Sequence, residues 1–171
     1  MKKTLLLIGL FLAFALGSYA QKYALVDMEY ILKRIPSYEM ANQELENYSE
    51  KWQEEVEKMQ QDVQNMYKTY QESIKSLSAT EKTKRENAIV AKENELQQLR
   101  NKYFGQEGEM FKRRESLIDP IQDAVYNAIK EIALKSGYMT VIDRASASSM
   151  IFASPDIDIS NEVLAKLGYS K

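Results

Sequence analysis

Aspartate is the residue type in this sequence that is best placed to do chemistry. Asp27 and Asp143 each follow a β-prone run, and two carboxylates at neighbouring strand ends could share acid and base work. However, the 171 residues include no His and no Cys, and they contain no Gly-rich phosphate loop, no Ser/His/Asp set and no metal-ligand cluster. We therefore predict no catalytic residues, no metal site, no cofactor and no enzymatic activity. The two aspartates are expected to have turn and strand-end roles.

The charge balance excludes a further class of partner. Net charge is −2 at pH 7, and charged residues make up 28% of the chain, spread along amphipathic stretches that are typical of solvated helix faces. Removing Lys2 and Lys3 with a leader would make the protein more negative still. Proteins that bind the phosphate backbone of a nucleic acid need positive charge. We therefore predict no nucleic-acid partner.

The N-terminus has the three parts of a secretory signal. Basic Lys2 and Lys3 precede an apolar run from Leu5 to Leu16, and Ser18-Tyr19-Ala20 places small residues where a signal peptidase cleaves. The apolar run is shorter than the roughly 20 residues of a membrane-spanning helix. We predict a signal peptide at residues 1–20, cleaved after Ala20, and export of a chain that is stable without disulfides.

The exported chain divides into two parts by pattern. Residues 21–36 and 118–171 contain the β-prone runs and short helices, whereas residues 37–117 are charged and periodic. The fold class predicted from this division is α+β, with a long antiparallel α-helical hairpin projecting from a small β-sheet body. Three strands and two short helices make a poor core alone, so we expect the body to oligomerise through its sheet.

The first limb of the hairpin is predicted from an apolar stripe that no Gly or Pro interrupts. It follows a strand at Tyr23–Asp27 and a brief helix, Met28–Ile35, that Pro36 should end. Steps of three and four residues place one helical face at Tyr38, Ala41, Leu45, Tyr48, Trp52, Val56, Met59, Val63, Met66, Tyr70, Ile74 and Leu77. The average step is close to 3.6 residues, which predicts a nearly straight rod.

The second limb should begin at a capping box, in which Ser78 is followed three residues later by Glu81. We predict one helix from about Ala79 to Leu117, antiparallel to the first and thinly packed on it. Its apolar stripe is weaker, with Ile89, Leu96, Leu99, Tyr103, Met110 and Leu117.

A glycine pair interrupts this second limb. Counting outward from the turn, Trp52 falls opposite Phe104 and Gly105, with Gly108 close by. Because Gly within a helix costs about 1 kcal/mol relative to Ala, the pair indicates a packing need or a bend. The hypothesis is that the two glycines make room for the indole of Trp52.

The C-terminal segment contains predicted helix signals at both ends. Asp119-Pro120 has the form of a helix start, and Gly137 that of a helix stop. Ser160 should cap a last short helix over Asn161–Leu167. Between these helices the sequence predicts two strands joined by a polar turn, at Tyr138–Asp143 and Ser149–Ala153.

Four segments together resemble the Skp/OmpH family of periplasmic chaperones. They are Ala24–Leu32, Tyr103–Glu109, Pro120–Asp123, and Gly137-Tyr138 with Val141–Asp143. The resemblance covers essentially the whole exported chain, in order and spacing. It implies a homotrimer in the periplasm, with a central β-body and three helical arms that enclose unfolded outer-membrane proteins without ATP and prevent their aggregation. Well-known members are basic, whereas this chain is mildly acidic, so the resemblance does not extend to lipopolysaccharide or anionic membranes.

Candidate client-binding residues are the apolar and aromatic side chains that lie off the seam or near the tip of the hairpin. They are Tyr67, Tyr70, Ile74, Leu77, Val90, Phe104 and Phe111. Local packing or contact between subunits explains them equally well. Weak contacts repeated on several arms would suit a protein that holds a client without ATP.

Basic residues gather near the turn of the hairpin and outnumber Glu72 and Glu81. They are Lys68, Lys75, Lys82, Lys84 and Arg85. Such a tip could meet acidic client segments, a membrane surface or lipopolysaccharide, or it could be an ordinary solvated helix end. A different function class also stays open, because the same hairpin could serve as a structural coiled-coil spacer of the cell envelope. Apolar residues outside the seam favour the chaperone.

Overall fold

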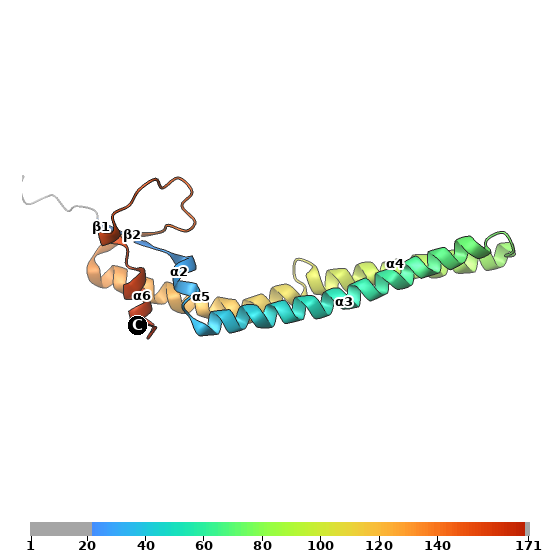
Figure 1. The fold of residues 1–171 in the computed structure, drawn as a ribbon, viewed down its shortest axis with the longest axis horizontal. Helices are drawn as coiled ribbons and strands as arrows, with labels where there is room; N and C mark the ends of the chain where they lie inside the picture. Colours follow the sequence, from blue (N-terminus) through green and yellow to red (C-terminus); the bar gives the residue numbers. More distant parts are fainter. Residues whose placement is uncertain (1–21, 170–171) are drawn as a thin grey trace, which may run out of the picture. The chain divides into compact units, whose positions relative to one another are not determined.

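The computed structural model describes residues 22–169 (Figure 1), so the predicted signal peptide lies outside the described residues. The chain forms two compact units. The terminal unit contains residues 22–31 and 125–169, and the arm unit is Leu32–Ala124. The elements are β1 (Lys22–Val26), α2 (Met28–Leu32), α3 (Pro36–Ser73), α4 (Ala79–Phe104), α5 (Glu109–Ser136), β2 (Tyr138–Asp143), a 3-10 turn η1 (Pro155–Ile157) and α6 (Ser160–Lys166).

Helix α3 forms the first limb of the arm unit, and its 38 residues span about 57 Å. Pro36 occupies the first turn of α3, where a missing N–H costs nothing, so it opens this helix as well as following α2. The predicted apolar stripe is confirmed by the residues of this helix that are buried. Its buried members are Ala41, Leu45, Trp52, Val56 and Val63.

Helix α4 returns beside α3, as Figure 1 shows. The predicted cap is confirmed, because Ser78 Oγ accepts a hydrogen bond of 3.3 Å from the Glu81 N–H. Only Ile89 and Tyr103 of α4 are buried. The two limbs therefore share a thin apolar seam, as the weak second stripe predicted. The α+β class, with a long helical hairpin and a small sheet, is confirmed.

The predicted single helix of the second limb is wrong, because the helix ends at Phe104 and a new one begins at Glu109. Gly105 has extended backbone (φ −66°, ψ 170°) and closes α4 through its N–H, which donates to the Asn101 carbonyl at 2.9 Å. The Gly108 N–H donates to the Gly105 carbonyl at 2.9 Å. The limb is therefore two helices joined by a tight glycine turn.

The predicted helix start at Asp119-Pro120 is also wrong, because Pro120 lies inside α5. A proline within a helix removes one backbone hydrogen bond and costs about 3 kcal/mol, so packing must favour continuation. Ile118 supplies that packing, since it is 3% exposed and clusters with Ala41 and Leu45 of α3. Tertiary contact here outweighs the local signal.

The terminal unit is built on a two-stranded parallel sheet, in which β1 pairs with β2 from Lys22 opposite Tyr138 to Val26 opposite Asp143. Ala24, Leu25 and Val26 are buried on this sheet. The core is completed from α5 and α6 by Val125, Ala128, Ile132, Val163 and Leu164. Helix α5 ends as predicted at Gly137, whose φ of 73° favours glycine.

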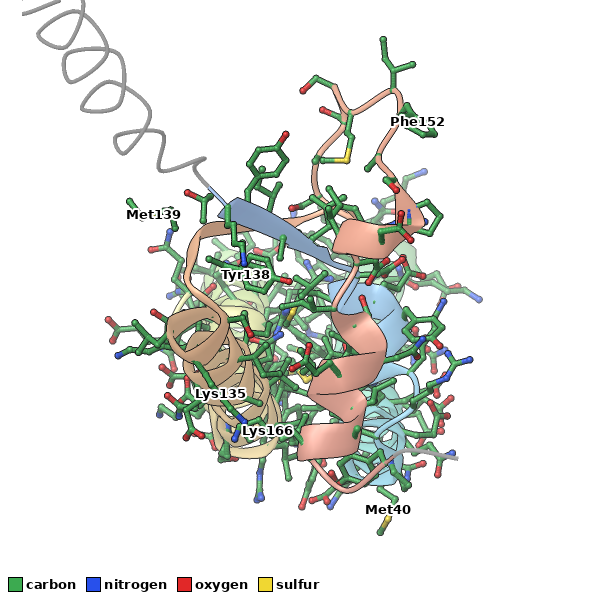
Figure 2. All side chains as sticks on the ribbon, turned by 90° about the vertical axis from the view of Figure 1, so that its left-hand side faces the viewer. Met40, Lys135, Tyr138, Met139, Phe152 and Lys166 are labelled. Atoms are coloured by element: carbon green, nitrogen blue, oxygen red, sulfur yellow. The ribbon has the colours of Figure 1, made fainter. Side chains whose placement is uncertain are left out.

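The predicted strand at Ser149–Ala153 is wrong, since these residues lie in an irregular loop. Among the described residues, β1 pairs with β2 on one side and Leu25 of β1 meets Asp158 in an isolated bridge, and Ser149–Ala153 pairs with neither strand. Ile151 is fully exposed and Phe152 is 83% exposed. Figure 2 shows Phe152 on this loop, pointing away from the helices of the unit.

Candidate functional site

The two aspartates that could have shared acid–base work are both engaged with backbone. Asp27 Oδ1 accepts from the Tyr30 N–H at 2.8 Å, and Asp143 Oδ1 accepts from the Met28 N–H at 3.1 Å. Together they cap the start of α2. Within residues 22–169, no group of carboxylates could hold a metal ion. The chemistry of Asp27 and Asp143 is therefore that of helix capping.

A polar network fixes the end of the sheet. The Asp27 N–H donates to Ser160 Oγ at 2.8 Å, and Asp158 Oδ1 accepts from the Ser160 N–H at 2.9 Å. Arg144 pairs with Asp158 at 3.1 Å and with Asp27 at 3.6 Å. Burial alone would raise the pKa of Asp158, but its hydrogen bonds from Ser160 and its pairing with Arg144 lower that pKa below the ordinary value. The predicted cap at Ser160 is wrong, because Ser160 is the first residue of α6 and its hydroxyl accepts instead from Asp27, the residue after β1.

The arm unit has an aromatic stack at its centre. Trp52 is sandwiched between Tyr103, at 5.0 Å between ring centroids, and Tyr48, at 5.2 Å. The hypothesis that glycines make room for the indole is wrong. A Cβ on Gly105 would lie 2.4 Å from the Asn101 carbonyl oxygen, and one on Gly108 would lie 2.8 Å from the Tyr103 carbonyl oxygen. The glycines are needed by the backbone of the turn itself.

Two of the candidate residues connect the limbs of the hairpin. The Tyr67 hydroxyl donates to Glu93 at 3.0 Å, and the Tyr70 hydroxyl donates to Glu86. The hydroxyl of Tyr103 likewise donates to Glu55. In each case the hydrogen bond to the carboxylate is the main cause that raises the pKa of the tyrosine. These tyrosine–glutamate pairs reinforce a seam that has little apolar surface, and their pairing could not be predicted from the sequence.

Four candidates present apolar surface to solvent. Tyr67 is 41% exposed, Val90 54%, Phe104 45% and Phe111 47%. Ile74, Leu77 and Tyr70 are half-buried near the turn of the hairpin. The seven residues do not form one patch. Tyr67, Tyr70 and Val90 lie on the hairpin toward its turn, whereas Phe104 and Phe111 lie on either side of the glycine turn.

Phe104 and Phe111 line a groove of about 600 Å³ at the glycine turn. Its apolar lining continues with Leu45 and Met110, which belong to the seam. Polar side chains also line the groove, and they are Tyr38, Asn42, Gln106 and Arg114. The sequence predicted the two phenylalanines but not these polar residues, because the second limb was predicted as one helix that continues through the glycine pair.

The basic residues near the turn are not equivalent. Lys68, Lys75 and Lys84 are exposed, and Lys82 is half-buried. Arg85 is held in place, because its Nη1 donates to Ser73 Oγ at 2.9 Å and its Nε lies 3.6 Å from Glu81. Arg85 therefore helps to close the turn, and three lysines present their charge to solvent.

Comparison with known proteins agrees with the resemblance. The family model described as outer membrane protein (OmpH-like) matches residues 22–167. Chaperone protein Skp of Yersinia enterocolitica is 28% identical over 162 residues, which are 94% of each chain. Among residues 22–169, none of the helices has the length and apolar character needed to cross a membrane. Because this match covers residues of both units and most of the chain, the chain belongs to the OmpH-like family.

Proposed function

We propose that this protein is an ATP-independent holdase chaperone, which binds unfolded outer-membrane proteins in the periplasm between the arms of a homotrimer and prevents their aggregation. The single observation that carries the proposal is the exposure of apolar side chains outside the seam, at Tyr67, Val90, Phe104 and Phe111. A rod that served only as a spacer would have no need of them. The relative named a chaperone, similar over 94% of its length, supports the same conclusion.

The binding mode follows from how this apolar surface is distributed. Each exposed side chain offers a small contact, and the contacts lie on both limbs of the hairpin. Several weak contacts on one scaffold raise the overall affinity while each of them breaks easily. A client could thus be held firmly and still leave when its own folding becomes more favourable, without nucleotide.

Assembly into a trimer belongs to the proposal, with the body that contains residues 21–36 and 118–171 as its centre and residues 37–117 as the arm. The terminal unit exposes several large apolar side chains, and clustered apolar surface is typical of contact sites for another protein. Its most exposed large side chains are Leu134, Met139, Ile151 and Phe152. Because Ser149–Ala153 has the composition of a strand but pairs with no strand among residues 22–169, we expect it to pair with another copy.

Two further elements of the proposal concern the location of the protein and the tip of the arm. Export would follow cleavage after Ala20.

The exposed Lys68, Lys75 and Lys84, with Lys82 and Arg85, would attract acidic client segments or the phosphorylated head groups of a membrane surface or lipopolysaccharide. Reversing Lys82, Lys84 and Arg85 to Glu should weaken client binding and flatten its salt dependence. Unchanged affinity and salt dependence would remove the tip from the mechanism.

The test of the function is suppression of aggregation. A β-barrel membrane protein in denaturant is diluted into buffer, and light scattering is followed with and without the purified protein. We expect scattering to fall sharply at one trimer per client, with no ATP present. Scattering that rises unaltered at that ratio would contradict the holdase function.

A further inference from the structure

The groove at the glycine turn combines apolar walls with an opening to solvent. Phe104, the last residue of α4, and Phe111, in the first turn of α5, each leave nearly half of the side chain exposed along it. Together with Leu45, Met110 and Ile118, they form the apolar lining. A volume of about 600 Å³ lies within the range of roughly 300–1,000 Å³ that is usual for sites binding small groups. One large side chain and its neighbours would fit.

The polar lining of the groove carries one positive charge. Arg114 is the one charged side chain among the lining residues, and within the described chain it makes no hydrogen bond or ion pair. Its neighbour Arg113 differs, because the Arg113 guanidinium stacks 4.4 Å over the Tyr48 ring. A free guanidinium beside an apolar groove selects a carboxylate, which it can bind through two parallel hydrogen bonds.

Beside Tyr38, the residues Asn42 and Gln106 add two side-chain amides to the lining. An amide side chain offers both a donor and an acceptor, which matches the N–H and C=O of an extended peptide backbone. Apolar rings, two amides and a free cation therefore fit one kind of occupant better than a lipid or a nucleotide, neither of which has a backbone of alternating donors and acceptors.

We propose that this groove binds an extended peptide segment in which a large aromatic residue stands next to an acidic residue. The aromatic side chain lies between Phe104 and Phe111, and the carboxylate pairs with Arg114. This assignment rests on the proposed holdase function, since the segment belongs to an unfolded client. It adds a sequence preference to a surface that would otherwise bind any apolar chain.

Fluorescence anisotropy of labelled decapeptides on the full exported chain tests this preference. One peptide carries Phe next to Glu, a second carries Phe next to Lys, and a third carries Ala next to Glu. We expect the first to bind about tenfold more tightly than either of the others, as for one charge-assisted hydrogen-bonded pair and one buried ring. Equal affinity for the three peptides would overturn the proposal.

Variants locate the effect. Arg114→Glu should reverse the preference between Glu and Lys peptides, and Phe111→Ser should abolish the preference for Phe over Ala. Lys130→Glu makes the same charge reversal on an exposed residue of the same helix and should change neither preference. If Arg114→Glu retains the original preference, the carboxylate is bound elsewhere and the proposal fails. If Phe111→Ser instead changes the molar mass of the assembly, a second copy occupies the groove and the proposal fails too.

The aggregation assay separates this site from the function itself. Suppression of aggregation by a protein that shows no peptide preference would contradict the groove assignment alone. A clear peptide preference in a protein that does not suppress aggregation would contradict the holdase function and leave a peptide-binding groove.

Discussion

Trp52 and Tyr103 lie face to face across the hairpin, with ring centroids 5.0 Å apart and planes only 8° from parallel. This pair, with Val56, forms the buried cluster that joins α3 to the end of α4, just before the glycine turn. The exposed apolar residues on both sides of this cluster keep their relative positions only while the two limbs stay in register.

Replacing Trp52 by Ala should therefore destabilise the arm substantially. Trp52 is 8% exposed, and truncating a buried tryptophan costs about 3–5 kcal/mol. Urea unfolding followed by circular dichroism would measure the loss. Met40→Ala is the control, because Met40 of the same helix is 68% exposed and its truncation should change the free energy of unfolding by no more than about 0.5 kcal/mol. Equal effects of the two changes would contradict the central role of the stack.

At the glycine turn, adding a single methyl group should destabilise the protein. In Gly105→Ala the new Cβ would lie 2.4 Å from the Asn101 carbonyl oxygen, so the backbone must move and the end of α4 must re-form. The melting temperature should fall. Gln106→Ala, at the next position and exposed, should leave it nearly unchanged. A melting temperature for Gly105→Ala equal to that of the parent would show that the turn does not require glycine.

The tyrosine–glutamate pairs predict loss of stability in alkali. The pKa values of Tyr67, Tyr70 and Tyr103 are raised above the ordinary 10.0, mainly because each hydroxyl donates to a glutamate. The folded state therefore holds these protons more tightly than the unfolded state. Their contribution is fully present below pH 10 and is lost as pH rises through the raised values.

Thermal unfolding measured between pH 8 and pH 11 checks this dependence. The parent protein should lose stability as pH rises above 10, and the triple change of Tyr67, Tyr70 and Tyr103 to Phe should lose less over the same interval. The Tyr126→Phe change is the control, because Tyr126 is an exposed tyrosine outside these pairs. Identical pH profiles for the parent and the triple variant would contradict the proposed linkage.

The exposed loop of the terminal unit predicts the behaviour of the assembly. Phe152→Asp places a charge where we expect contact with another copy, and it should lower the molar mass measured by light scattering at low micromolar concentration. Val90→Asp makes the same kind of change on the arm, at a residue that is also exposed, and should leave the molar mass unchanged. An unchanged molar mass in Phe152→Asp would show that this loop lies outside the subunit interface.

The sequence predicted most of the regular structure, because period and capping are local properties. The stripe of α3, the Ser78 cap and the Gly137 stop follow from residues a few positions apart. The errors have a common cause. Pro120 continues a helix because Ile118 packs on α3, and Ser149–Ala153 has no strand partner in the part of the chain that the structure describes. Both outcomes depend on contacts far along the chain or outside it.

The candidate site could be predicted only in part, again because some of its features depend on contacts between residues far apart in the chain. Phe104, Phe111 and Val90 are exposed as their positions off the stripe indicated. The groove beside Arg114 was missed, because it exists only where α4 stops and α5 restarts, and a continuous helix would have spread its lining residues over separate faces.

Site-specific photo-crosslinking tests the central claim most directly. A photoreactive amino acid is placed at Val90 or Phe111 on the arm, or at the exposed Met139 of β2. Each protein is then illuminated with a denatured β-barrel client. We expect the arm positions to crosslink to the client, and Met139 to crosslink to another copy of the chain. Crosslinks to the client from Met139 and none from the arm, in a protein that still prevents aggregation, would contradict the account.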